Sequence, residues 1–218
     1  MNNTANRVKS RIGLLAAILF TILFVTNAMA TEEPKFTTLE KSGDFELRQY
    51  EPFIVAETFV NGTLDEASSS GFRLIASYIF GNNKSRTRVG EEKIAMTAPV
   101  SVEQSSEKIA MTRPVTVEHF GDTWRVYFIM PTAYTMGTLP FPKDARVSLR
   151  EIEAQKKAVI TFSGFAGEAK VKLKTDALLE WMKIHGLEAT STPKLARYNP
   201  PWTLPFMRRN EILISYRP

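Results

Sequence analysis

The chain has 218 residues, no cysteine, and 28 basic against 23 acidic residues, a formal net charge of +5. The absence of cysteine excludes disulfide bonds, thiolate metal sites and a cysteine nucleophile. Residues 1–30 hold three of the basic residues and no acidic one, so the rest has 25 basic against 23 acidic residues, or +2. The small net positive charge of residues 31–218 therefore does not predict nucleic-acid binding. These 188 residues are enough to bury a core as a single domain.

The first thirty residues have the layout of a secretory signal peptide. A basic start precedes the uncharged run 12–25, and residues 28–30, Ala-Met-Ala, place small side chains where a signal peptidase cleaves. We therefore expect a periplasmic or secreted protein whose mature chain begins at Thr31. The apolar run is shorter than the roughly 20 residues of a bilayer span. The alternative is an uncleaved anchor in the inner membrane through residues 12–30, the only membrane contact that the sequence predicts.

Two strands and a helix are predicted next along the chain. FELRQY (45–50) and FIVAETFV (53–60) are rich in aromatic and β-branched residues, which favours strands. Thr63 and Glu66 have the spacing of a capping box, and Gly81 is placed to end the helix. Between these ends, apolar or small residues recur at helical spacing: Ala67, Gly71, Phe72, Ile75, Tyr78 and Ile79.

A nearly identical stretch then occurs twice, as EKIAMTAPVSVE (92–103) and EKIAMTRPVTVE (107–118). Apolar residues alternate in both copies, so we predict two strands, joined as a hairpin by the polar residues between them. Each copy contains a proline, which has no N–H for a ladder and is expected at an edge or bulge. The doublet is interpreted as architectural. The alternative is that Met96 and Met111 line an adaptable apolar binding surface.

The second half of the chain repeats this order of strands and helix. We predict one domain, residues 31–218, with pseudo-repeats of about 36–118 and 124–216, and an α+β class. The predicted elements of the second half are strands at 124–130, 146–153, 157–165, 193–199 and 211–217, and a helix at about 168–185.

Three long motifs resemble the SOUL family of haem-binding proteins. They are IAMTAPV with KIAMTRPV, then YFIMPTAYT followed by LPFPKDARVSLRE, then RYNPPWTLPFMRRNEI, and the similarity runs from about residue 36 to 216. The resemblance implies two βαββ repeats that form a distorted eight-stranded antiparallel barrel or curved sheet flanked by two helices. The same architecture resembles the effector-binding domains of bacterial regulators, but this sequence shows no helix-turn-helix segment.

The resemblance also implies a function: non-catalytic binding of haem or a related tetrapyrrole, as a carrier or buffer outside the cytoplasm. In the family the ligand is ascribed to an apolar surface of the first helix and the late proline-rich loop. Arg73 is the one basic residue of that helix that could hold a propionate. The helix also has a serine-rich face, which leaves room for a different flat apolar ligand. Carried onto this chain, the site residues are Phe72, Arg73, Ile75, Ala76, Tyr198, Pro201 and Trp202.

No metal site is predicted from the histidines. His119 and His185 are the only two in the chain, they are far apart in sequence, and neither lies on the first helix. They are the histidine candidates for an axial iron ligand. Without a third ligand type at a suitable spacing they do not predict a zinc site.

Two other classes of function are alternatives. No sequence motif of a nucleophilic or phosphate-binding enzyme is present, and a hydrolase of the effector-binding-domain type would have to use Tyr127 and Glu211. Glu211 is instead expected to pair with Arg208 or Arg209. A periplasmic interaction or structural module is the second alternative, because the segments 131–145 and 200–207 combine prolines with aromatic residues, as docking surfaces do.

Overall fold

A computed structural model describes residues 31–86 and 106–218 of the chain. The chain divides into two compact units, residues 1–31 and 32–218. Every element named below belongs to the second unit. The predicted signal peptide, the first copy of the doublet and the hairpin predicted with it lie outside the described residues.

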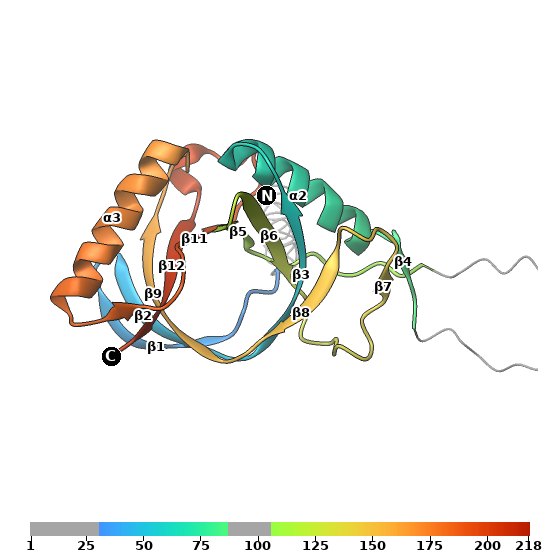
Figure 1. Ribbon diagram of the computed structural model, residues 1–218, viewed down its shortest axis with the longest axis horizontal. Coiled ribbons are helices and arrows are strands. Elements are labelled where there is room, and N and C mark those ends of the chain that lie inside the picture. Colours follow the sequence, from blue (N-terminus) through green and yellow to red (C-terminus); the bar gives the residue numbers. More distant parts are fainter. Residues whose placement is uncertain (1–30, 87–105) are drawn as a thin grey trace, which may run out of the picture. The chain divides into compact units, whose positions relative to one another are not determined.

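The second unit is built on a curved antiparallel sheet of ten strands (Figure 1). The path of paired strands ends at β1 and β8, so the sheet is open and does not close into the eight-stranded barrel that was one of the two predicted forms. The α+β class and the curved sheet flanked by two helices are confirmed. In spatial order the strands are β1 (Phe36–Ser42), β2 (Phe45–Tyr50), β9 (Gln155–Phe162), β12 (Asn210–Arg217), β11 (Lys194–Arg197), β5 (Val115–Phe120), β6 (Thr123–Ile129), β3 (Phe53–Val60) and β8 (Ser148–Ile152), with β10 (Glu188–Ala189) paired to β12.

The order of pairing is the same on the two sides of the sheet centre. There β5 pairs with β11, and Val117 lies opposite Leu195. Outward from this pair the order is β5-β6-β3-β8 on one side and β11-β12-β9-β2 on the other. A duplicated chain would produce this order, but duplication of residues 36–118 as 124–216 stays a prediction. Two short strands, β4 (Asn83–Lys84) and β7 (Phe141–Pro142), pair separately.

Both helices lie on the same face of the sheet (Figure 1). The first, α2 (Leu64–Ile79), begins at the predicted capping box, in which the Thr63 hydroxyl accepts from the Glu66 N–H and the Glu66 carboxylate accepts from the Thr63 N–H. It packs closely on β6 because residue 71 is glycine: a Cβ there would lie 2.5 Å from Cβ of Val126. The second helix, α3 (Glu168–Ile184), covers β9 and β12. No helix within the described ranges is long and apolar enough to cross a membrane.

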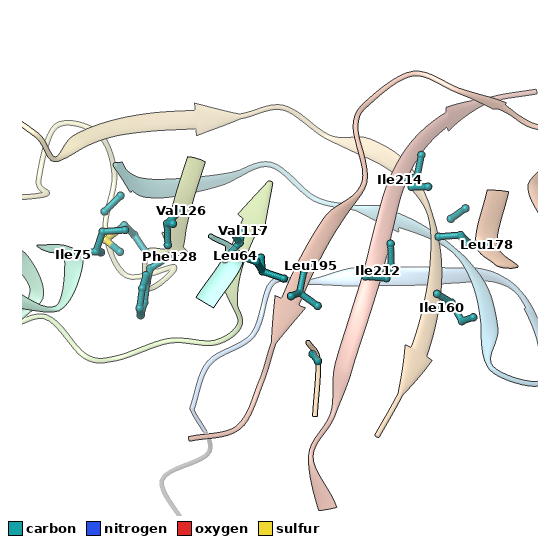
Figure 2. Close-up of a cluster of buried hydrophobic side chains, with 14 of the residues drawn as sticks. Leu64, Ile75, Val117, Val126, Phe128, Ile160, Leu178, Leu195, Ile212 and Ile214 are labelled. Atoms are coloured by element: carbon teal, nitrogen blue, oxygen red, sulfur yellow. The ribbon is translucent and has the colours of Figure 1, made fainter. Parts of the chain in front are cut away.

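One apolar core fills the space between the helices and the sheet (Figure 2). Alternate residues of each strand point into it, because side chains alternate between the two faces of a sheet. Ile75 from α2 and Leu178 from α3 are fully buried there. The strands contribute Val117, Val126, Phe128, Ile160, Leu195, Ile212 and Ile214.

Apart from the short strands β4, β7 and β10, the structure differs from the sequence prediction chiefly in two segments. The second copy of the doublet was predicted as a strand over 107–118, but only its last residues belong to β5. Before Pro114, backbone N–H groups donate to carbonyls that do not belong to a neighbouring strand. The Ile109 N–H donates to the Ile79 carbonyl, and the Arg113 N–H donates to the Glu32 carbonyl. The strand β1 was not predicted. It is an edge strand exposed on both faces after Phe36, so its sequence carries no apolar alternation.

Candidate functional site

The face of the sheet away from the helices carries aromatic and charged side chains, many of them buried. We call it the helix-free face. Its side chains alternate along each strand with those of the core, as Val159 does between Ala158 and Ile160. The principal buried members are Arg48, Tyr50, Tyr127, Lys157, Tyr198 and Glu211.

A buried carboxylate, that of Glu211 on β12, is at the centre of one hydrogen-bond network. Arg48 on β2 donates to both of its oxygens, at 3.0 and 3.1 Å. Tyr198 donates to it at 2.6 Å, and Arg209 donates at 2.9 Å. The predicted pairing of Glu211 with Arg208 or Arg209 is therefore correct for Arg209. The buried pairing with Arg48 joins residues 163 positions apart.

These contacts determine the protonation state of Glu211. Burial alone raises its pKa, but the hydrogen bonds and charge of Arg48, together with Arg209, outweigh burial and the pKa is lowered. The carboxylate is therefore ionised at neutral pH and already accepts several hydrogen bonds. A general base needs a pKa near the working pH and a free oxygen lone pair. This geometry makes Glu211 a poor base for the hydrolase alternative and gives it a structural role.

A second set of ion pairs crosses the other half of the same face. Glu118 on β5 accepts from Arg125 at 2.8 Å and is 2.5 Å from the Lys194 ammonium. Glu57 on β3 accepts from Arg150 at 2.7 Å. These carboxylates are therefore also paired and do not form a free acid–base site.

The segment just before β1 crosses the helix-free face and is held there by hydrogen bonds. The Glu32 carboxylate accepts from the Thr132 N–H at 2.9 Å, and Glu33 accepts from Arg209 at 3.0 Å. Pro34 between this segment and β1 is buried. The segment thus closes part of the face and leaves a cavity beside it.

That cavity has a volume of about 490 Å³, within the usual range for ligand pockets. Its walls come from the segment 32–35, from the start of β3 with Glu51, and from the β6–β7 connection with Tyr134. Apolar side chains, among them Phe53 and Met130, form part of its lining. The cavity lies where β3 begins and β6 ends, and it is lined both by Phe53 and Ile129 of the helix-free face and by Ile54 and Met130 of the core.

An exposed apolar surface lies elsewhere, on the loop between β11 and β12 and on Phe165 of the β9–α3 connection. Arg208 orders the loop by donating to the Thr203 carbonyl at 2.8 Å and to the Pro201 carbonyl. Its guanidinium also lies 4.8 Å from the centre of the Phe165 ring. We call the exposed apolar residues the late-loop surface: Phe165 (65% exposed), Trp202 (82%), Leu204 (55%), Phe206 (73%) and Met207 (62%).

Comparison with known families assigns the chain. The family model described as SOUL heme-binding protein matches residues 31–215, most of the chain. The chain belongs to this family. Among curated protein sequences, none is significantly similar to the chain.

Solved structures with the same fold are remote in sequence from this SOUL protein. The C-terminal domain of EcmrR has a TM-score of 0.57 at 11% identity, over 79% of this chain and 96% of that one. A hydrolase from Listeria innocua has a TM-score of 0.51 at 12% identity, over 82% of this chain and 94% of that one. At such identities the similarity shows the fold alone.

The seven site residues carried over from the family do not form one surface in this SOUL protein. On α2, Phe72 and Arg73 are exposed, whereas Ile75 and Ala76 are buried under the helix. Tyr198 is buried on the helix-free face. Pro201 and Trp202 are exposed in the late loop. A ligand site that uses all seven residues stays a prediction. Four of them are exposed and can be contacted by a ligand at the protein surface: Phe72, Arg73, Pro201 and Trp202.

Sequence reasoning missed two features that the structure brings out. The predicted ligand site left out Phe206 and Met207, although the segment 200–207 was considered as a docking surface, and both residues extend the exposed apolar surface beyond Trp202. Lys157 is buried at 3% exposure although its neighbour Lys156 is exposed. Two adjacent lysines in a strand carry no sign of which one points inward.

The two histidines lie apart, each against a tryptophan. The His119 ring is 3.6 Å from the Trp124 ring, centre to centre, and the His185 ring is 4.1 Å from that of Trp181. His185 also follows the last turn of α3 and bonds the Trp181 carbonyl through Nδ1 at 2.8 Å. Within the described residues, no three histidine, aspartate or glutamate side chains are grouped to hold a metal ion.

Proposed function

We propose that this SOUL protein binds haem or a related tetrapyrrole without catalysis, on the late-loop surface. The observation that carries the proposal is the gathering of large apolar side chains, each more than half exposed, on the ordered β11–β12 loop, with Phe165 of the β9–α3 connection held against Arg208 of that loop. Soluble proteins rarely expose such groups together unless they bind something there. Family membership supports the ligand class. The proposal keeps Pro201 and Trp202 of the predicted site.

The residues of this surface fit the parts of a haem. The aromatic and aliphatic side chains suit a porphyrin face, and each Å² of apolar surface buried contributes about 25 cal/mol. The Met207 thioether is exposed on the same loop and is of a type that ligates haem iron. Lys170 donates to the carbonyl of Ser163, two residues before Phe165 in the chain, at 2.7 Å and supplies a cation for a propionate. When bound, haem would supply an iron centre; the chain's part is to hold it and shield one face.

A haemin titration followed through the Soret band tests the proposal. We expect saturable binding, with a Kd on the order of micromolar. Trp202→Ser should weaken it about tenfold or more, because a large aromatic contact is lost. Leu173→Ser is the matched control, since Leu173 is an exposed apolar residue on α3 at 65% exposure. Absence of saturable binding, or equal losses in the two variants, would show that the late-loop surface is not a haem site and would favour the docking alternative.

We also propose that the protein acts outside the cytoplasm, as a carrier or buffer of its ligand. The basic start, the uncharged run and the Ala-Met-Ala sequence of the first thirty residues support export. N-terminal sequencing of the protein from an exporting cell should find Thr31 first. A chain that still begins at Met1 would instead support the anchor.

A further inference from the structure

Lys157, on β9, is a buried lysine with an unusual environment. Only 3% of its surface is exposed, and within the described residues its ammonium has no hydrogen bond or ion pair. The nearest ring centres to Nζ are those of Tyr50, at 4.9 Å, and Phe53, at 5.7 Å. A fully buried lysine is rare without a partner, because removing its charge from water is costly. Aromatic faces compensate only part of that cost.

The charges around Lys157 leave it without a counter-ion. The carboxylate that attracts it, Glu118, is already paired with Lys194 and Arg125, and the Lys194 charge opposes that of Lys157. Glu211, on the neighbouring strand β12, is occupied by arginines. The titratable and charged groups that face Lys157 from the surrounding strands are Arg48 and Tyr50 of β2, Glu118 of β5, Tyr127 of β6, and Lys194 with Tyr198 around β11.

A small chamber lies beside the Lys157 side chain. Its volume is about 20 Å³, enough for one water-sized group such as a single carboxylate oxygen. The Thr116 and Tyr127 side chains line it together with Lys157 and bring hydroxyl groups to its wall. Pro34 and Phe53 line both this chamber and the 490 Å³ cavity, so the two spaces adjoin.

The larger cavity differs in character from the chamber. Ile54, Met130 and Met136 give it apolar walls. Among the described residues, its other lining side chains include four glutamates, Glu32, Glu33, Glu51 and Glu151, and one cation, Lys35. A neutral chain is therefore compatible with this cavity, whereas a second negative charge on a ligand would be repelled there.

We infer that Lys157 binds the carboxylate of an amphipathic monocarboxylate whose apolar chain occupies the 490 Å³ cavity. The ligand carboxylate is the counter-ion that Lys157 lacks, with Thr116 and Tyr127 beside it as hydroxyl partners. Lys157 lies on the helix-free face, and this site does not depend on haem binding at the late-loop surface.

Protonation of Lys157 makes binding at this site pH-dependent. Burial, and next the charge of Lys194, lower the pKa of Lys157 to about 7, although the Glu118 charge opposes this. The ammonium form is therefore the minor form above neutral pH. Since an anion binds the ammonium form, binding takes up a proton, and the affinity should fall about tenfold for each pH unit above 7.

Isothermal titration of the full chain with octanoate, a monocarboxylate, at about pH 6 tests the inference. Octan-1-ol tests the need for the charge, and the dicarboxylate suberate tests the repulsion by the acidic lining. We expect saturable octanoate binding, at least about tenfold tighter than either comparison ligand, and weaker binding at about pH 8 with proton uptake. Lys157→Met should abolish the preference for octanoate over octan-1-ol.

Lys156→Met is the matched control, because Lys156 is the exposed neighbour on the same strand. It should bind octanoate as the unmodified protein does, and both variants should keep the far-UV circular dichroism of a folded protein. The inference is wrong if octanoate shows no saturable binding, binds no better than octan-1-ol, or binds equally to Lys157→Met. Haemin titration of Lys157→Met separates the two sites, since its haemin affinity should be unchanged.

Discussion

The buried pair of Arg48 and Glu211 allows a quantitative test of the structure. Arg48 is 3% exposed and Glu211 is fully buried, and the two form a bidentate contact. Arg48→Met keeps an unbranched apolar side chain but removes the guanidinium and its charge. The carboxylate of Glu211 would then remain buried with fewer donors. Removing one partner of a buried ion pair costs about 3–5 kcal/mol of folding free energy.

We expect a loss near the lower end, about 3 kcal/mol, because Arg209 and Tyr198 still donate to Glu211. Urea unfolding followed by circular dichroism measures this loss. The matched control is Arg217→Met, which breaks another bidentate contact, with Glu188, whose two side chains are 65% and 62% exposed. An exposed pair contributes little, so the control should be close to the unmodified protein. Equal losses in the two variants would refute the reasoning.

Acid should reduce the effect of Arg48→Met. The pKa of Glu211 in the folded protein lies below its ordinary value of 4.5. Its ionised form therefore stabilises the fold above about pH 4.5, and this contribution is lost as the pH falls through the folded pKa. The difference in unfolding free energy between Arg48→Met and the unmodified protein should shrink below about pH 4.5. A difference that stays constant to about pH 3 would contradict the assignment of the effect to this carboxylate.

Three further predictions follow from packing, protonation and loop order. Gly71→Ala should lower the unfolding free energy by about 1–3 kcal/mol, because the new Cβ would lie 2.5 Å from Val126. Gly167→Ala is the control and should change the unfolding free energy little, because no atom lies within 4 Å of its new Cβ. Lys157→Met should have a higher unfolding free energy than the unmodified protein near pH 6. This difference should shrink as the pH rises from about 7 towards 10.5, because Lys157 loses its proton at a lower pH in the folded protein than in the unfolded chain. Arg208→Ala should weaken haemin binding several-fold by loosening the loop, with a melting temperature within about 2 °C of the unmodified protein.

Local sequence signals determined most of the helices and strands. The capping box at Thr63 and Glu66 sets the start of α2, because these side chains satisfy N–H groups within their own turn. The aromatic and β-branched residues of 53–60 predicted β3 with its observed bounds. Such signals are local, so a single sequence is enough to show them. They were weakest at β1, an exposed edge strand without a buried face.

The candidate sites depended more on the tertiary structure. The motif RYNPPWTLPFMRRNEI carried the family resemblance, and the family model confirms the family. Whether Trp202 points outward while Tyr198 points into the sheet could not be read from that motif. Both are aromatic residues of one short segment, and their directions depend on where β11 ends and on how Arg208 holds the loop.

By itself, the sequence of this SOUL protein determined its class, the order of its elements, its family and the ligand class that the family suggests. Only the tertiary structure decided which charged groups are buried and paired. Arg48 and Glu211 are 163 positions apart and meet because β2, β9 and β12 lie side by side. Lys157 is buried because the segment 32–35 and the strand β5 enclose its chamber. Burial and charge pairing depend on neighbours from distant parts of the chain, so a local sequence pattern cannot predict them.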